Sequence, residues 1–306
     1  MKKYLYSIAI LSIISSCKTG QIDDLANNPT VKVTMDLTAV KNDKVLVTVD
    51  PGKITNESVT FYIPKTVPGT YSVDNYGKFI EDLKAFDYNG NEILATQTGE
   101  NSWDFLNAPE LDKITYYVND SFDVEGEEGI FSPSGTNIDK GENFLLNLHG
   151  FVGYFDGMKE QPYKILISRP QALIPGTSLK IANSVKAEKA PTTIIDSYNA
   201  GRYFDVVDHP IMYAEPDTTS INVDGMKVLL NVYSPNNVYS TEDLKPSIEK
   251  MITAQKQFLG DIDNTPVYAI LLYLSDPEEL DARGFGALEH HTSTVVVLPE
   301  MMPLEN

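Results

Sequence analysis

The chain has 306 residues, of which 42% are hydrophobic and 22% charged, and its formal net charge is −19 at pH 7. This composition is that of a folded globular protein, long enough for two domains, and it excludes an intrinsically disordered chain. The acidic balance argues against nucleic acid as a partner, because a protein that neutralises phosphates needs clustered lysine and arginine.

The amino terminus has the pattern of a secretory signal peptide. It reads MKKYLYSIAILSIISSC, with Lys2 and Lys3 ahead of an apolar stretch and two serines behind it. About 11 apolar residues fall short of the roughly 20 needed for a membrane-spanning helix, and small residues before a cleavage point suit a signal peptidase. We therefore predict that residues 1–16 are a signal peptide and that the protein is exported.

Cys17 is the only cysteine in the sequence, so no internal disulfide can form. The stretch Ile-Ser-Ser-Cys resembles a bacterial lipobox, in which the cysteine carries the lipid, although Ile14 stands where leucine is commoner. Acyl chains would anchor the protein, at about 0.8 kcal/mol for each buried methylene. Cys17 is therefore the predicted lipidation site of a bacterial membrane lipoprotein, on the periplasmic or cell-surface face, and residues 17–30 form the lipidated cysteine and a polar tether. An unlipidated secretory signal is the alternative.

Residues 31–224 have the pattern of an all-β domain. VKVTMDLTA alternates apolar and polar positions, and KVLVTVD, SVTFYIP, KITYYVND, NFLLNLH and YKILISR follow in similar style. Turns are expected between them, for example at Asn89-Gly90 and Pro175-Gly176. We predict a β-sandwich or one large twisted sheet, without a helix longer than two turns.

The pattern changes from all-β to mixed in residues 225–306. KVLLNVYS predicts a strand, and STEDLKPSIEKMITAQKQFLGD has the apolar spacing of a helix that Ser240 and Asp243 can cap. Since Pro246 is tolerated only in the first turn, we expect this helix to begin near residue 243. VYAILLYLSD then predicts a strand buried on both faces, followed by a last strand. This order is the beginning of an α+β domain.

Residues 284–297, GFGALEHHTSTVVV, hold two of the four histidines side by side. On an extended strand side chains alternate, so Glu289 and His291 face one side while Leu288 and His290 face the other. Adjacent histidines on a strand therefore cannot bind one metal ion together. From spacing alone, this stretch is either the start of an ordinary strand, with bending glycines and solvated histidines, or part of a functional site.

The sequence contains none of the common hydrolytic motifs. A zincin requires His-Glu-x-x-His on a helix, because histidines four apart share a face and the glutamate activates the bound water. No two histidines of this chain are four apart, and there is neither a Gly-x-Ser-x-Gly elbow nor a Gly-x-x-x-x-Gly-Lys phosphate loop. We expect no catalytic residue and no metal ligand in the sequence given.

Three segments together resemble a known family. GFGALEHHTSTVVV resembles the Gly-Gly-x-Glu-His-x-x-Ser-Thr segment of the glycyl aminopeptidases, the bacterial gluzincin zinc metallopeptidases of peptidase family M61. PKTVPGTYSVDNYGKFIEDLKAFDYNG resembles that family's Pro-x-x-x-Pro-Gly-x-Tyr stretch, and YFDVVDHPIMYAEP resembles its Leu-Val-Asp-x-Pro-Val-Met segment. The resemblance runs in order through residues 31–298 and covers the amino-terminal part of the family only. It implies that residues 225–306 are the first layer of a truncated, thermolysin-like α+β catalytic domain.

The resemblance also implies roles for residues of the 284–297 segment. In the family this strand borders the active-site cleft, and a peptide adds to it by main-chain pairing. Gly284 and Gly286 would let the substrate backbone approach, with Ala287 where a second glycine is commoner. Glu289 stands where the family receives the free α-amino group of the peptide, and His290 would contact the substrate or buttress the strand. The implied partner is a peptide with a free amino terminus.

The family's zinc ligands are expected beyond the sequence given. In the family, His-Glu-x-x-His comes a few tens of residues after this strand, followed by a glutamate ligand and often a PDZ domain. We therefore expect no cofactor in this chain, zinc in the complete protein, and no peptide hydrolysis by this chain alone. The alternative is an exported β-sandwich lipoprotein that binds glycan or protein without catalysis. A third possibility is a substrate-gripping or inhibitory subunit of a separate catalytic chain.

Overall fold

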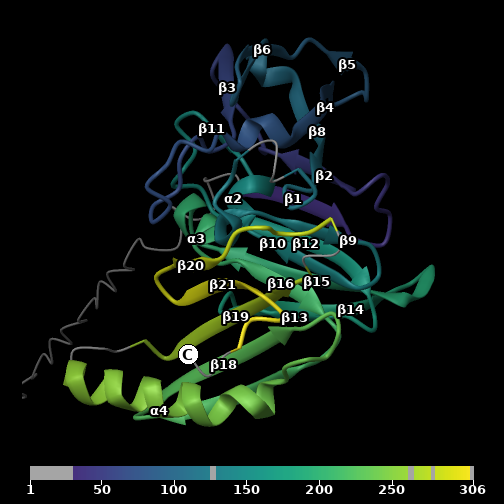
Figure 1. Cartoon of the computed structure of the whole chain (residues 1–306). Helices are drawn as coiled ribbons and strands as arrows, with labels where there is room; N and C mark the ends of the chain where they lie inside the picture. The colour runs from purple at the N-terminus through teal and green to yellow at the C-terminus, as the bar shows by residue number, and fades with distance from the viewer. Residues whose placement is uncertain (1–29, 125–128, 261–264, 277–279, 304–306) are drawn as a thin grey trace, which may run out of the picture.

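A computed structural model describes residues 30–124, 129–260, 265–276 and 280–303. The expected signal peptide, Cys17 and nearly all of the tether lie outside these residues. Within them the chain forms four sheets and few helices, so the mainly β class predicted from the sequence is confirmed (Figure 1). No helix in these ranges is long and apolar enough to cross a membrane.

The largest sheet has eight strands in the order β14-β15-β12-β1-β2-β8-β4-β5. Its alternating strands bury one face, as in β1, where Val31, Val33 and Met35 are buried and the residues between them are not. The eight strands are β1 (Val31–Asp36), β2 (Lys44–Asp50), β4 (Ile80–Asp87), β5 (Glu92–Ile93), β8 (Leu111–Asn119), β12 (Tyr163–Pro170), β14 (Ile181–Ala187) and β15 (Ala190–Ala200).

Two four-stranded sheets pack with this large sheet around one apolar core, whose members include Phe61, Phe105 and Phe155. The first sheet consists of β13 (Ile174–Gly176), β16 (Ile211–Ala214), β10 (Asn143–Leu146) and β9 (Asn137–Asp139), and the second of β11 (Tyr154–Phe155), β3 (Ser58–Tyr62), β7 (Ser102–Leu106) and β6 (Thr96–Gly99). The helices here are short, as expected: α2 (Leu148–Phe151), α3 (Tyr203–Val207), η1 (Tyr76–Phe79), η2 (Ala108–Glu110) and η3 (Ser132–Ser134). We call these three sheets and their short helices the β domain.

The remaining sheet has five strands in the order β17-β18-β19-β21-β20. Its strands are β17 (Thr218–Val223), β18 (Met226–Tyr233), β19 (Val267–Ser275), β20 (Gly286–Glu289) and β21 (Ser293–Pro299). The three inner strands run parallel, and β17 and β20 are antiparallel edge strands. The helix α4 (Thr241–Leu259) packs along β17 and β18 on the side away from the β domain (Figure 1). β19 is almost continuously buried, as its run of apolar residues predicts.

The helix α4 begins two residues earlier than expected. Ser240 and Asp243 form a capping box, in which each side chain accepts from the backbone N–H of the other, and this places Thr241 at the first helical position. Asp217 adds a second anchor, since its carboxylate accepts from the Thr241 N–H and hydroxyl. These contacts outweigh the cost of Pro246, which lies in the second turn rather than the first.

The GFGALEHHTSTVVV segment is a hairpin, and our expectation of one continuous strand was wrong. β20 and β21 pair antiparallel, and the chain turns at His291 and Thr292. The His290 N–H donates to the Ser293 carbonyl (2.8 Å), which closes a two-residue turn. Apolar residues lie on both sides of the polar residues in this segment, and such a pattern fits either one long strand or two short strands. Contacts with side chains of the β domain stabilise the two-strand form here.

The β domain and the five-stranded sheet share an apolar interface. Phe122, Leu145 and Met212 of the β domain pack with Leu271 and Tyr273 of β19. The Phe122 and Tyr273 rings lie edge to face with centroids 5.3 Å apart. The sheet is therefore covered on one face by the β domain and partly on the other by α4.

Candidate functional site

The edge strand β20 presents unpaired backbone on its outer side. His290 is hydrogen-bonded to Ser293, and bonded and unbonded positions alternate along an antiparallel pair. Glu289 opposite Thr294, and Ala287 opposite Val296, are therefore the unbonded positions, and their N–H and C=O groups point away from β21. Among the described strands, only β21 pairs with β20. This edge is the geometry that an added peptide strand requires.

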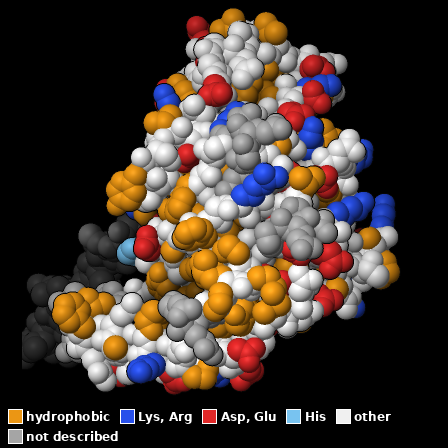
Figure 2. All heavy atoms as spheres, in the orientation of Figure 1, with side chains coloured by type: hydrophobic (Ala, Val, Ile, Leu, Met, Phe, Trp, Pro, Cys, Tyr) orange, Lys and Arg blue, Asp and Glu red, His pale blue; other side chains and the backbone are white. Residues whose placement is uncertain are grey.

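The side chains of Ala287, Glu289 and His291 face the side of the sheet that α4 partly covers, as the alternation predicts. All three are exposed and line one cavity of about 510 Å³. The cavity is otherwise mostly apolar, and the rest of its lining is Met226, Met251, Ile252, Gln255, Lys256, Leu259, Thr265, Tyr268, Ile270, Thr294 and Val296. Figure 2 shows one face of the molecule, on which apolar side chains gather in the lower half, the region of the five-stranded sheet. Glu289 is thus an exposed carboxylate at an apolar hollow beside an open strand edge.

Glu289 changes the electrostatics of its surroundings. Burial raises the pKa of Tyr268, and the negative charges of Glu289 and Asp208 raise it further. Glu289 therefore places a negative charge at the cavity wall, which favours a cationic group such as a protonated amine, and Lys256 in the same lining carries the opposite charge.

The opposite face of β20 packs tightly on the β domain. Leu288 is fully buried, and a Cβ on Gly69 would lie 2.8 Å from its Cδ1. A Cβ on Gly286 would lie 3.0 Å from two atoms of the Phe131 ring. Gly286 therefore has a packing reason to be glycine, besides the substrate approach that the resemblance implies. Gly284 precedes the strand and is half-buried.

Asp208 and His209 fasten the hairpin turn to the β domain. Asp208, which ends α3, accepts from the His291 N–H through both carboxylate oxygens, each at 3.2 Å. The Nε2 of His209 lies 3.1 Å from the Thr292 hydroxyl. Burial of Asp208 raises its pKa, but hydrogen bonds from His290 and His291 and the charge of His290 outweigh burial and lower it overall. Asp208 therefore holds the turn as a carboxylate.

The His290 side chain is buried and His291 is exposed, so the alternative of two solvated histidines does not hold for His290. The His290 side chain is only 4% exposed, and its Nδ1 lies 3.6 Å from the Asp208 carboxylate. This ring buttresses the strand from the β domain side, away from Glu289 and the open cavity. Of the two roles that the resemblance implies for His290, the geometry favours the buttress.

The three segments quoted from the sequence meet at this hairpin. Gly69 belongs to the first segment, Asp208 and His209 to the second, and Leu288 and His291 to the third. Residues more than two hundred positions apart therefore build one site. Asp208 and His209 lie in the second segment, but nothing in the sequence assigned them a role. The only feature that marks them is that they are an adjacent Asp-His pair at the end of a short helix.

His149 is a neighbour of this site that no motif marks. It is fully buried on α2, and its Nε2 lies 2.9 Å from the Ser134 carbonyl. Burial lowers its pKa to about 3, the Ser134 carbonyl raises it, and the charge of His290 lowers it again. His149 is therefore neutral at physiological pH and lies close enough to His290 to respond to its charge.

The residues that could hold a metal do not gather in this part of the protein. Within the described ranges, no three histidine, cysteine, aspartate or glutamate side chains are arranged to bind one ion. The described residues therefore do not fit a zinc ion, and we derive no hydrolytic step from them.

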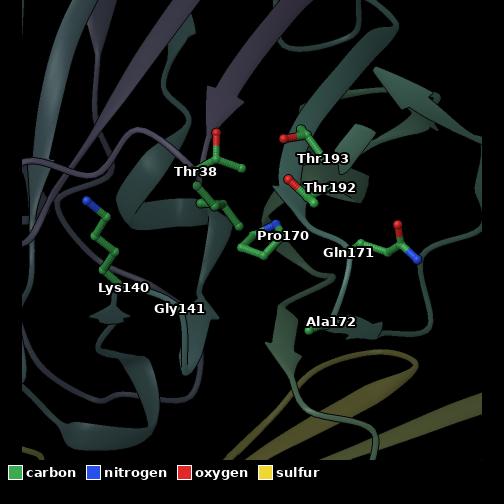
Figure 3. A pocket seen from close by; sticks show the side chains of 9 residues that line it. Thr38, Lys140, Gly141, Pro170, Gln171, Ala172, Thr192 and Thr193 are labelled. Carbon is green, nitrogen blue, oxygen red and sulfur yellow. The ribbon is translucent and has the colours of Figure 1, made fainter. Parts of the chain in front are cut away.

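A second hollow, of about 630 Å³, lies in the β domain and lacks these features (Figure 3). Its lining is Leu37, Thr38, Lys140, Gly141, Pro170, Gln171, Ala172, Thr192 and Thr193. Lys140 is the one charged residue in this lining, which therefore contains no carboxylate to receive an amino group. The chemistry of this hollow is correspondingly unspecific, and β20 remains the candidate site.

The family comparison agrees with the residues that meet at β20. The Peptidase M61 N-terminal domain matches residues 32–215, more than half of the chain. The chain belongs to the M61 peptidase family. The first segment lies within the matched region, the second lies within it except for its last residue, Pro216, and the β20 hairpin lies beyond it.

A solved structure shows the same fold with little sequence identity. An aminopeptidase N family protein from Idiomarina loihiensis superimposes with a TM-score of 0.72 at 16% identity, over 90% of this M61 chain and 44% of that chain. An M1 zinc metallopeptidase from Deinococcus radiodurans gives a TM-score of 0.47 at 10% identity, over 88% and 60% of the two chains. The M61 chain thus spans less than half the length of the first of these proteins. No curated protein matches it.

Proposed function

We propose that this chain supplies the peptide-binding strand of a lipid-anchored, zinc-dependent aminopeptidase that acts outside the cytoplasm. The observation that carries the proposal is the placement of Glu289, an exposed carboxylate on the open edge strand β20, at an apolar cavity of about 510 Å³. Membership of the M61 family and the metallopeptidase-related fold support it.

In this proposal a peptide adds to β20 as a further antiparallel or parallel strand. The outward N–H and C=O groups of Ala287 and Glu289 supply the main-chain bonds. The free α-amino group of the peptide then bonds to the Glu289 carboxylate, and its first side chain enters the apolar cavity. In a longer peptide whose chain continued past this position, the additional residue would occupy the space next to the Glu289 carboxylate. The site would select free amino termini in this way.

The zinc ion and the lipid anchor are further parts of the proposal. Zinc would be held by residues outside the described ranges, and Cys17 would carry the lipid. The length relation to the Idiomarina loihiensis protein, of which this chain spans 44%, is compatible with a zinc-binding part elsewhere in the complete protein. Codons for His-Glu-x-x-His in frame after Asn306 in the gene would support the proposed zinc site. A gene without them would contradict it.

Peptide binding tests the proposed role of Glu289 without requiring hydrolysis. The probe is a short glycine-initiated peptide with a fluorophore at its carboxyl end, compared with its N-acetylated twin by fluorescence anisotropy. A charge-assisted hydrogen bond is worth about 1.5–3 kcal/mol, so the free peptide is expected to bind roughly 10- to 100-fold more tightly. Glu289→Gln should abolish most of this preference.

Glu110→Gln is the matched control, because Glu110 is an exposed glutamate of the β domain in η2. This variant should keep the full preference for the free amino terminus. Equal affinity of the wild-type chain for both peptides, or an unchanged preference in Glu289→Gln, would overturn the proposal and favour a binding module for glycan or protein.

A further inference from the structure

The cavity beside Glu289 is larger and more apolar than the binding of an amino group requires. Its volume of about 510 Å³ is that of a small-molecule site, and more than half of its lining residues are apolar side chains of α4 and the five-stranded sheet. Ile252 and Ile270 in this lining are buried, whereas Met251 and Leu259 are 44% and 43% exposed. An apolar group placed in the cavity would therefore remove exposed apolar surface from water, which favours binding.

Only one direction of an added peptide strand fits the position of Glu289. β20 runs from Gly286 to Glu289, and the chain turns soon afterwards at His291 and Thr292. A peptide that has its amino group at Glu289 and also pairs with Ala287 must therefore run from Glu289 toward Gly286. The added strand is then antiparallel to β20.

The open positions of β20 determine where the first side chain of this peptide points. Ala287 and Glu289 have their N–H and C=O groups on the open edge. Residues opposite each other in an antiparallel pair have Cβ atoms about 4.5–5.5 Å apart on the same face of the sheet. Because Ala287 and Glu289 both line the cavity, a peptide residue paired with either of them has its side chain on the cavity face as well.

We propose that this site selects peptides whose amino-terminal residue is large and apolar, such as leucine or methionine. The inference rests on the proposed peptide-binding role of β20 and adds the class of the first residue. Glycine at that position would leave the apolar walls in water, whereas leucine or methionine would cover part of them, which should strengthen binding roughly 10- to 100-fold. Met226 and Met251 in the lining are flexible and can adapt to side chains of different shape.

The charged side chains of the lining favour the same class of peptide. Glu289 would receive the amino group, so its charge would already be paired when the first side chain enters the cavity. Lys256 is only 7% exposed and adds a positive charge to the cavity wall. A lysine or arginine at the first position would therefore meet a like charge, whereas a neutral apolar side chain would not.

A panel of peptides that differ only in their first residue tests the proposal on the complete chain. The probes are the glycine-initiated fluorescent peptide and its leucine, methionine and lysine counterparts, each with its N-acetylated twin. We expect the leucine and methionine peptides to bind roughly 10- to 100-fold more tightly than the glycine peptide, and methionine to bind more tightly than lysine, whose side chain is also long and unbranched.

The panel distinguishes a failure of this inference from a failure of the proposed function. Equal affinities for the glycine and leucine peptides, or lysine binding as tightly as methionine, would overturn the inference. A preference for free over acetylated amino termini would leave the role of Glu289 standing in that case. If no peptide showed this preference, the proposed function and the inference would both be overturned.

Ala287→Leu connects the expected selectivity to the cavity. Ala287 is exposed at the cavity, so the larger side chain occupies space that the first peptide residue needs but leaves the backbone free to pair. The preference for leucine over glycine should fall several-fold, while the glycine peptide should keep its preference for a free amino terminus. The control is Ala172→Leu, because Ala172 is an exposed alanine that lines the hollow of the β domain. A leucine preference that is the same in both variants would contradict the assignment of the cavity.

Discussion

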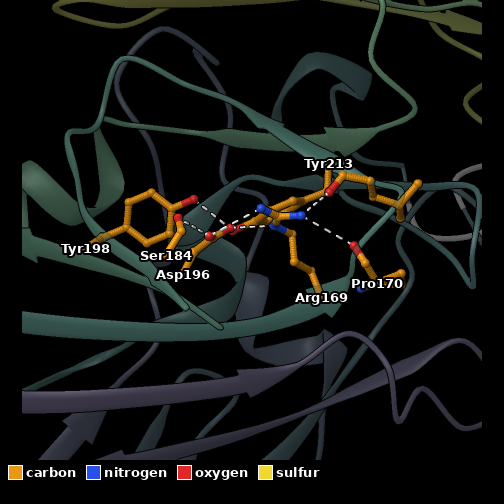
Figure 4. Close-up of polar contacts among 7 residues, drawn as sticks. Arg169, Pro170, Ser184, Asp196, Tyr198 and Tyr213 are labelled. Atoms are coloured by element: carbon orange, nitrogen blue, oxygen red, sulfur yellow. Dashed lines mark hydrogen bonds and ion pairs between the residues drawn. The ribbon is translucent and has the colours of Figure 1, made fainter. Parts of the chain in front are cut away.

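Two buried polar clusters of the protein differ in how completely they are satisfied. In the β domain, Asp196 accepts from Arg169 at 2.6 Å, from Ser184 at 2.6 Å and from Tyr213 at 3.2 Å (Figure 4). Arg169 also donates to the Leu173 carbonyl at 2.6 Å. The Asp196 carboxylate is surrounded by hydrogen-bond donors, and the Arg169 guanidinium donates to acceptors. We therefore interpret this cluster as structural.

The cluster behind β20 is less complete. His149 and His290 each keep a ring nitrogen without a partner, and Asp208 holds a turn that ends next to an exposed glutamate. Buried polar groups in folded proteins nearly always have a partner, either protein or ordered water, so groups without a protein partner call for an explanation. We therefore interpret the Asp196 cluster as structural and the cluster behind β20 as part of the candidate site. Substitutions in and around the two clusters should distinguish these roles.

Asp196→Ala should cause the largest loss of stability. The substitution leaves the Arg169 guanidinium buried without its carboxylate, and breaking a buried ion pair from one side costs about 3–5 kcal/mol. Chemical denaturation, followed by tryptophan fluorescence of Trp103 in the same domain, measures the change. The matched control is Glu92→Ala, whose pair with Lys84 is more than half exposed and should contribute less than about 1 kcal/mol. Similar losses in both variants would contradict the structural role of the Asp196 cluster.

A cavity between the β domain and β19 should make the protein more stable at mildly acidic pH, because its lining includes Asp43, Asp120, Asp123, Asp139, Asp276 and Asp281. Burial raises the pKa of Asp281 to about 6, and burial also raises the pKa of Asp120, Asp123 and Asp139. A carboxyl whose pKa is higher in the folded state binds its proton more tightly there, so its stabilisation is present below pH 4 and is lost as pH rises through 6. Asp281 alone can account for at most about 3 kcal/mol.

The melting temperature should therefore fall as the pH rises from about 4 to 6, and Asp281→Asn should flatten part of this slope. Asp87→Asn is a suitable control, because hydrogen bonds from Asn91 lower the pKa of this partly exposed carboxyl, which therefore titrates at more acidic pH. A melting temperature that rises with pH over this range would contradict the assignment.

Gly176→Ala should loosen the joint between the two parts of the protein. A Cβ at Gly176 would lie 2.4 Å from the buried Asn231 side chain of β18, and overpacking of this kind costs about 1–3 kcal/mol. Gly150→Ala is the control, because its added Cβ would find ordinary contacts at 3.6 and 3.8 Å. Equal melting temperatures for the two variants would show that the joint adapts without cost.

Gly69→Ala should act on the packing of β20 with a smaller effect. Gly69 and Gly90 both have positive φ, +95° and +81°, so alanine is strained at either position. Only the Gly69 variant also places a Cβ against the buried Leu288 side chain, whereas the space at Gly90 is open. The difference between the variants, about 1 kcal/mol by thermal denaturation, isolates this contact. Identical losses would mean that Gly69 does not support the strand.

Local patterns of the sequence predicted most of the elements correctly. The alternation in VKVTMD, the unbroken apolar run of β19 and the helical spacing of α4 each have one structural solution, because side-chain direction follows backbone geometry. The side chains of Glu289 and His291 face one cavity for the same reason.

Features set by contacts between distant residues could not be predicted in this way. Pro175-Gly176 has the composition of a turn, but it lies in β13 because the missing side chain lets β13 approach Asn231. The turn at His291 depends on Asp208, which is 83 positions away. The complete burial of His149 is likewise visible only in the fold, because no motif surrounds this residue. The resemblance to the M61 family supplied the position of Glu289, whereas spacing alone left the segment open.

Residue-resolved hydrogen exchange of β20 tests the central claim most directly. The amides of Ala287 and Glu289 point to the open edge. With the glycine-initiated peptide added at saturating concentration, their exchange rates should fall by roughly tenfold. The amides of Leu288 and His290 already face β21 and should change little, as should all four in the presence of the N-acetylated peptide. Protection at Ala287 and Glu289 alone would show a peptide strand adding to β20, and exchange rates unaffected by the peptide would contradict the account.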